Sequence, residues 1–211
     1  FYQLDVVGHG VPAALLSFTL NRLLSQGAEE KRLRRQDGGQ DDAAIPQLLA
    51  SELNRRFQSG IDPLQYFTMI YGNLDLRSGR VNLTQAGHPK PIWLRRAERR
   101  AEPVGGGGFP VGMLPDVEYE TTSFDLANGD RLFLYSDGVT ECADPAGEQF
   151  SEPRLRRLLE TMIDLPAAAV AERVGRALLE WKGDDDHRDD ITLLVLEREH
   201  GHDPDHQPGY R

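Results

Sequence analysis

Three segments in the middle of the chain, each alternating between apolar and polar residues, constrain the fold more than any other feature. They are residues 66–76 (YFTMIYGNLDL), 79–87 (GRVNLTQAG) and 90–96 (KPIWLRR). Side chains that alternate in this way indicate half-buried β-strands, because successive residues of a strand point to opposite faces. Short turns such as Arg-Ser-Gly at 77–79 join them, and strands joined by short turns run in opposite directions. The sequence therefore predicts an antiparallel meander.

Further segments predict additional strands and helices around this meander. Strands are expected at 1–7, 118–126, 131–137 and 189–197. Helices are expected from Pro12 over about fifteen residues, from Pro46 to Phe57, and near 152–163 and 166–182. Residues 27–44 carry the densest charge with almost no apolar periodicity, so we expect an exposed loop there. We divide the chain into one domain, 1–198, and a disordered polar tail, 199–211.

The composition narrows the class of protein. The chain has 211 residues, 39% of them hydrophobic, which favours one domain with a substantial core. Its formal net charge of -10 argues against nucleic acid as a partner. Its single cysteine, Cys142, excludes an internal disulfide framework and favours the cytoplasm. No stretch approaches the roughly 18 apolar residues of a membrane span, so we expect no membrane association.

Aspartates stand at the ends of three predicted strands. Asp5 lies in LDVVGHG, Asp137 in LYSDGVTE, and Asp189 with Asp190 in HRDDITLLV. A carboxylate at the edge of a packed sheet is costly unless a positive group pairs with it, and the first two runs contain no lysine or arginine. Hard divalent cations such as Mg²⁺ and Mn²⁺ would serve. The alternative is that Asp5 and Asp137 begin ordinary turns that glycine completes.

Five motifs in series carry a family resemblance. They are LDVVGHGVPAALL at 4–16, the meander at 69–94, PVGMLPDVEYE at 110–120, GDRLFLYSDGVTE at 129–141 and DDITLLVLE at 189–197. In this order and spacing they resemble the metal-dependent protein phosphatase family, relatives of protein phosphatase 2C, and within it the bacterial SpoIIE-like branch. The resemblance implies an α+β fold: a four-layer αββα sandwich of two antiparallel sheets flanked by helices.

The resemblance also implies a binuclear Mn²⁺ or Mg²⁺ centre. Asp5 matches the residue that bridges the two metals, and Val6 matches the neighbour that offers its backbone carbonyl. Asp137 and Asp189 match further ligands, and Asp190 stands where the family has Asp or Asn. These aspartates are the expected catalytic residues, because the metals they hold would activate water. In the first helix, Ala13, Ala14 and Leu15 match core packing positions.

The function implied is hydrolysis of phosphoserine or phosphothreonine on a regulatory protein. In this branch the substrate is an anti-sigma-factor antagonist of a bacterial partner-switching pathway, and a receiver or sensor domain lies upstream. The alternative is a catalytically impaired module that keeps the fold and binds a signalling partner without turnover. A metal-dependent nuclease would use similar carboxylates but should present a basic face, which the net charge of -10 disfavours.

Three positions complicate the transfer of roles from the family. The family carries another metal-binding Asp in a Gly-Asp turn on a strand before Phe1. This chain starts without methionine inside a strand-like run, so we expect the N-terminal strand region to be truncated. For His9 the sequence leaves open a turn residue, a proton donor or a phosphate contact. For His88 it leaves open a structural turn or a substrate contact.

Overall fold

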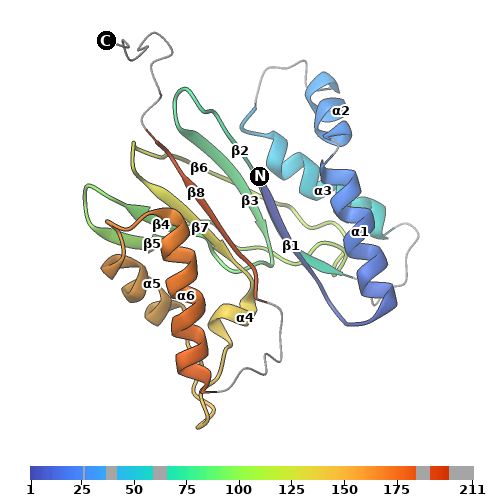
Figure 1. Cartoon of the computed structure of the whole chain (residues 1–211). Coiled ribbons are helices and arrows are strands. Elements are labelled where there is room, and N and C mark those ends of the chain that lie inside the picture. Colours follow the sequence, from blue (N-terminus) through green and yellow to red (C-terminus); the bar gives the residue numbers. More distant parts are fainter. Residues whose placement is uncertain (26, 37–41, 59–65, 184–190, 200–211) are drawn as a thin grey trace, which may run out of the picture.

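The computed structural model describes residues 1–25, 27–36, 42–58, 66–183 and 191–199, and within them eight strands and six helices (Figure 1). The elements follow in the order β1 (Tyr2–Val6), α1 (Val11–Ser25), α2 (Ala28–Gln36), α3 (Ile45–Gln58), β2 (Phe67–Leu74), β3 (Arg80–Ala86), β4 (Ile92–Arg95), β5 (Arg100–Pro103), β6 (Thr121–Asp125), β7 (Arg131–Tyr135), α4 (Asp137–Thr140), α5 (Glu152–Thr161), α6 (Ala167–Lys182) and β8 (Leu193–Glu197).

The strands form two four-stranded antiparallel sheets, in the orders β1-β2-β3-β6 and β5-β4-β7-β8. The three strands of the predicted meander are present as β2, β3 and β4, and β2 and β3 pair as expected. The pairing predicted for the third strand is wrong, because the chain leaves the first sheet after β3 and β4 pairs with β5 and β7 in the second. Alternation along β2 shows which face of the first sheet packs against helices and which packs against the second sheet. Phe67, Met69 and Tyr71 pack with the helices of α1–α3, whereas Ile70 packs between the sheets.

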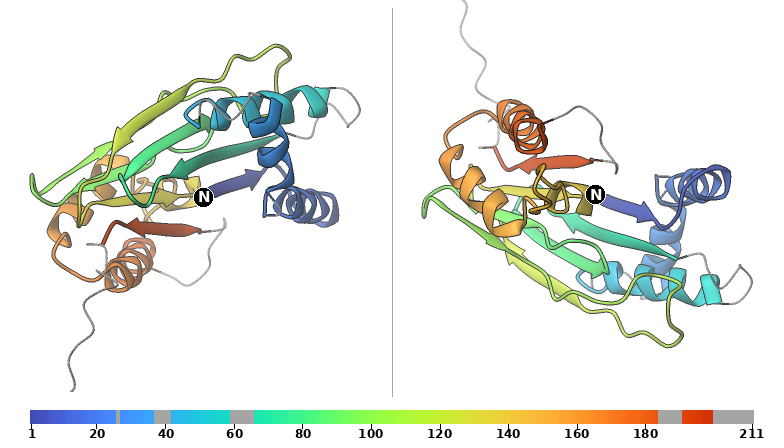
Figure 2. Two further views of the ribbon diagram at one scale, coloured as in Figure 1. Left: turned by 90° about the horizontal axis from the view of Figure 1, so that it is seen from above. Right: turned by 90° about the horizontal axis from the view of Figure 1, so that it is seen from below.

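The helices cover the outer faces of the two sheets, which confirms the four-layer αββα sandwich (Figure 2). Helices α1, α2 and α3 cover the first sheet, and α5 and α6 cover the second. A third apolar cluster lies between the sheets and includes Leu83 of β3 and Leu134 of β7. The two sheets are therefore stacked face to face. Strand ends of both sheets can lie side by side at the edge of the sandwich, where residues of both can form one site.

The prediction of an exposed loop over 27–44 is wrong, because α2 occupies Ala28–Gln36. Two features stabilise this helix, and neither produces a periodic pattern of apolar residues in the sequence. Its charges are arranged for a helix, with Glu29 and Glu30 in the first turn and arginines in the last. Leu33 is buried against α1 and α3, so one apolar side chain anchors an otherwise charged helix.

The expected core positions of α1 also need correction. Leu16, Leu20 and Leu24 are buried, but Leu15 is 62% exposed and Ala14 is exposed as well. One residue is a rotation of about 100° on a helix, so a helix that buries Leu16 turns Leu15 away from the core. Strand β5 and the short helix α4 were not predicted from the sequence. Among the described residues, no helix is long and apolar enough to span a membrane.

Candidate metal centre

Asp5 of β1 and Asp137, which begins α4 just after β7, line one pocket of about 470 Å³. With Val6, which also lines it, the pocket brings together three of the residues that the sequence selected. The lining consists of β1, the turn after it, one face of α1, and single residues of β2 and α4: Asp5, Val6, Val7, Gly8, His9, Gly10, Ala13, Ala14, Ser17, Thr68 and Asp137. The small side chains of Ala13 and Ala14, expected in the core, instead form part of this wall.

Alternation along β1 explains the position of Asp5. Tyr2, Leu4 and Val6 pack against the helical cluster of α1–α3. Asp5 therefore points to the opposite face, towards the second sheet. It lies directly across from Thr68 in the β1–β2 register, and side chains in this relation have Cβ atoms about 5 Å apart.

The end of β7 fixes Asp137. Ser136 donates its backbone N–H to the Thr192 carbonyl at 3.1 Å, and its Oγ accepts the Thr192 N–H at 3.0 Å. These bonds fasten the end of β7 to the chain just before β8. The Asp137 carbonyl accepts the Glu141 N–H at 2.8 Å, which closes the short helix α4. The backbone on both sides of Asp137 is therefore held rigidly.

One oxygen of the Asp137 carboxylate, Oδ1, is buried and has no hydrogen-bond partner within the described residues. A buried acceptor left unpaired costs about 1 to 3 kcal/mol, and more when the group is charged. The described residues that line the pocket include no lysine or arginine that could neutralise this carboxylate. The donor set, two carboxylates and the Val6 carbonyl, is of the kind that Mg²⁺ and Mn²⁺ prefer, so the residues present fit a divalent cation.

The turn between β1 and α1 forms one wall of the pocket. Gly8 and Gly10 have φ angles of 99° and 83°, a region that side chains disfavour. The Gly10 carbonyl accepts the Ala14 N–H at 3.1 Å and so starts α1. His9, between the glycines, is exposed and lines the pocket.

Asp189 and Asp190 lie outside the described residues, so their predicted place as ligands stays a prediction. Within the part of the chain that the structure describes, no three or more His, Cys, Asp or Glu side chains cluster closely enough to hold a metal ion.

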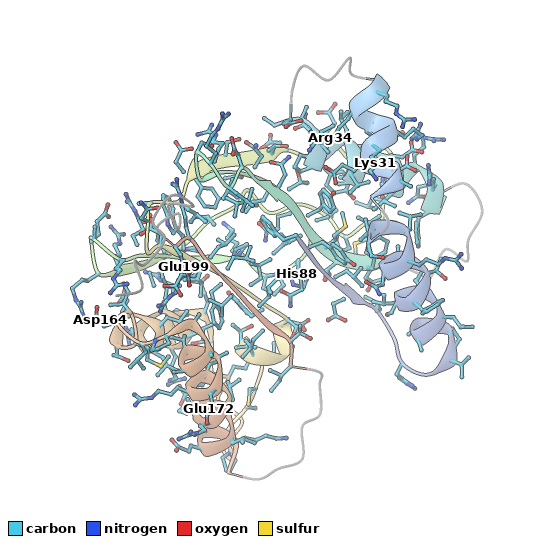
Figure 3. The ribbon with its side chains drawn as sticks, turned by 45° about the horizontal axis from the view of Figure 1, so that its top comes forward. Lys31, Arg34, His88, Asp164, Glu172 and Glu199 are labelled. Atoms are coloured by element: carbon cyan, nitrogen blue, oxygen red, sulfur yellow. The ribbon has the colours of Figure 1, made fainter. Side chains whose placement is uncertain are left out.

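Thr68 and His88, which the sequence analysis did not connect, contact each other behind the pocket. Thr68 lines the pocket, and its Oγ1 lies 2.8 Å from Nδ1 of His88. His88 is 2% exposed, and Figure 3 shows it in the interior of the molecule. Burial lowers the pKa of its imidazole to about 4, so the ring is neutral near pH 7. Thr68 shares its face of β2 with Ile70, which packs between the sheets, so alternation along the strand gives no signal that singles it out.

Two facing antiparallel sheets, outer helices and carboxylates from both sheets at one end define the class of the protein phosphatase 2C fold. The SiaA-PP2C domain of Pseudomonas aeruginosa superposes with a TM-score of 0.73 and 22% identity, over 93% of this chain and 73% of that one. The catalytic domain of the serine/threonine phosphatase PstP in complex with two manganese ions superposes with a TM-score of 0.63 and 16% identity, over 92% and 85% of the chains.

The chain belongs to the family of Stage II sporulation protein E (SpoIIE), which matches residues 1–199. Phosphoserine phosphatase RsbU of Bacillus subtilis (strain 168) is 27% identical over 194 residues, which is 92% of this chain. The chain spans about half the length of the curated relatives it matches, 54% and 44% of the first two.

Proposed function

We propose that this chain is the catalytic part of a Mn²⁺- or Mg²⁺-dependent protein serine/threonine phosphatase. The observation that carries the proposal is the buried Oδ1 of Asp137, which has no hydrogen-bond partner among the described residues and lies in the pocket that Asp5 also lines. The carboxylates of Asp5 and Asp137 line the same pocket, and oxygen ligands of this kind are those that a divalent cation prefers. Family membership and the names of the relatives support the same activity.

In this proposal Asp5, the Val6 carbonyl and Asp137 would hold the metal ions. Asp189 and Asp190 would add carboxylate ligands. Such ions, when bound, lower the pKa of water and offset the charge of the phosphoryl group. Among the described residues, those lining the pocket include no cysteine or lysine. The protein therefore contributes mainly positioning and electrostatics, which is what phosphoryl transfer requires.

The proposed substrate is a phosphorylated anti-sigma-factor antagonist in bacterial partner switching, acted on in the cytoplasm. This step rests on the curated relative named a phosphoserine phosphatase and on family membership. The proposed arrangement includes a receiver or sensor domain that controls the phosphatase. The length of the relatives leaves room for further domains of this kind in them.

The test is Mn²⁺-dependent release of phosphate from a phosphoserine protein, and it compares Asp137→Asn with the parent chain. Asn keeps the shape of Asp but loses the charge, so we expect the rate to fall at least about a hundredfold, as for loss of a group central to charge stabilisation. Asp164→Asn is the matched control, because Asp164 is 59% exposed in a surface ion pair with Arg99. It should retain the parent rate.

A module that keeps the fold and binds a signalling partner without turnover is the alternative that the same experiment tests. If parent and Asp137→Asn release phosphate equally, or if no divalent ion supports release, the enzyme proposal is wrong. Binding of the phosphoprotein with no release would then support the module.

A further inference from the structure

A contact between Thr68 and His88 lies behind the pocket wall. Thr68 stands across from Asp5 in the β1–β2 register and lines the pocket, so it forms part of the wall next to a candidate metal ligand. Its hydroxyl is 2.8 Å from Nδ1 of His88. His88 does not line the pocket. Any effect of His88 on chemistry there therefore passes through Thr68.

The segment carrying His88 is itself held in place. Gln85, at 5% exposure, donates its side-chain amide to the His88 carbonyl. The Gln85 Oε1 accepts the Gly107 N–H at 2.8 Å. These contacts fix the backbone after β3, so the ring of His88 is a rigid partner for Thr68.

The ring of His88 turns one nitrogen towards the pocket wall. The buried ring is neutral near pH 7 and so carries one proton. Nδ1 faces the Thr68 hydroxyl at 2.8 Å, and Nε2 makes no hydrogen bond within the described residues. With the ring proton on Nε2, Nδ1 holds a lone pair to which the Thr68 O–H can donate.

We propose that His88 is a positioning residue that directs the Thr68 hydroxyl proton away from the pocket, so that the Thr68 oxygen accepts a hydrogen bond from the water that attacks phosphorus. This inference rests on the proposed phosphatase function. A phosphoryl oxygen carries no proton to donate, so an acceptor at Thr68 selects water over the substrate phosphate. Thr68 would thus orient the nucleophile rather than bind the ester.

The hydrolysis balances without a chemical change in either residue. The water oxygen forms a bond to phosphorus, and the bond from phosphorus to the serine oxygen breaks. One water proton ends on the serine oxygen, and the other remains on the hydrogen phosphate. Thr68 and His88 keep their own protons throughout.

The kinetic test uses the whole chain with Mn²⁺ and p-nitrophenyl phosphate as the probe. Thr68→Val and His88→Leu should each lower kcat about tenfold to a hundredfold with KM nearly unchanged, because a misplaced water affects the chemical step. Thr68→Ser keeps the hydroxyl and should retain most of kcat. His88→Asn places a polar atom near the position of Nδ1 and should restore part of it. The double variant Thr68→Val/His88→Leu should be no slower than either single one, since both act through one hydroxyl.

Other kinetic results would overturn the inference. A raised KM with unchanged kcat in Thr68→Val would make Thr68 a phosphate contact. A loss of kcat in His88→Leu but not in Thr68→Val would reduce His88 to a folding role.

A nitrogen NMR spectrum of the imidazole gives a readout that does not depend on activity. We expect an unprotonated Nδ1 that accepts a hydrogen bond in the parent chain and changes its resonance in Thr68→Val. A protonated Nδ1 would overturn the inference even in an active enzyme. If the parent chain releases no phosphate, the proposed function fails, and this spectrum still decides the Thr68–His88 arrangement.

Discussion

At the scale of single residues, His88 makes stability depend on pH. Burial lowers its pKa from 6.5 to about 4. Between these values the unfolded chain binds a proton at residue 88 and the folded chain does not, so acid favours unfolding. The folded state should therefore lose about 3 kcal/mol from this group as pH falls from 6.5 to 4, and nothing above 6.5.

Urea unfolding from pH 7.5 to 4.5 measures this effect in the parent chain and in His88→Asn. Carboxylates titrate in both proteins, so the difference between the two stability curves isolates residue 88. The parent should lose more stability than the variant below pH 6.5. Parallel curves would show that the ring titrates normally.

The residues of the site show how far sequence reasoning reaches. Strand-end position and residue type were enough to select Asp5 and Asp137, and the structure brings both to one pocket. Thr68 and His88 were not joined in advance, because they are 20 positions apart in sequence and meet only through the path of the chain after β3. A local pattern carries no information on such a contact.

At the scale of elements, helix α2 allows its surface ion pairs to be compared with its one buried leucine as sources of stability. Arg32 makes ion pairs with Glu29 and Glu52, but its side chain is 41% exposed. Leu33 is 7% exposed and packs in the cluster that covers the first sheet. Leu33→Ala should therefore destabilise the fold by about 2 to 4 kcal/mol. Arg32→Ala should cost less than about 1 kcal/mol and less still at high salt.

Urea unfolding at low and high salt compares the two variants, and alanine in both keeps helix propensity favourable. Equal costs, or a larger and salt-dependent cost for Arg32→Ala, would show that the ion pairs hold the helix. The elements that the sequence did predict, such as α3 and β2, have several apolar residues at regular spacing. Helix α2 has one, which is too few to define a period.

At the scale of the whole molecule, the pocket joins two sheets that otherwise meet through apolar packing. Asp5 belongs to the first sheet, and Asp137 follows β7 of the second. A cation held by both carboxylates binds the folded chain and not the unfolded one, because unfolding separates them. Its binding free energy therefore adds to the stability of the fold as a whole.

Thermal unfolding with increasing Mn²⁺ tests this linkage without measuring catalysis. At about a hundred times the dissociation constant the stabilisation is about 2.7 kcal/mol, which raises Tm by about 5 to 10 °C for a chain of this size. Asp137→Asn should lose most of the shift, whereas Asp164→Asn should keep it, because its carboxylate pairs with Arg99 on the surface. An equal shift in Asp137→Asn would place the metal elsewhere. If Asp137→Asn loses both the Tm shift and the activity, the cation binds in the pocket that Asp5 and Asp137 line.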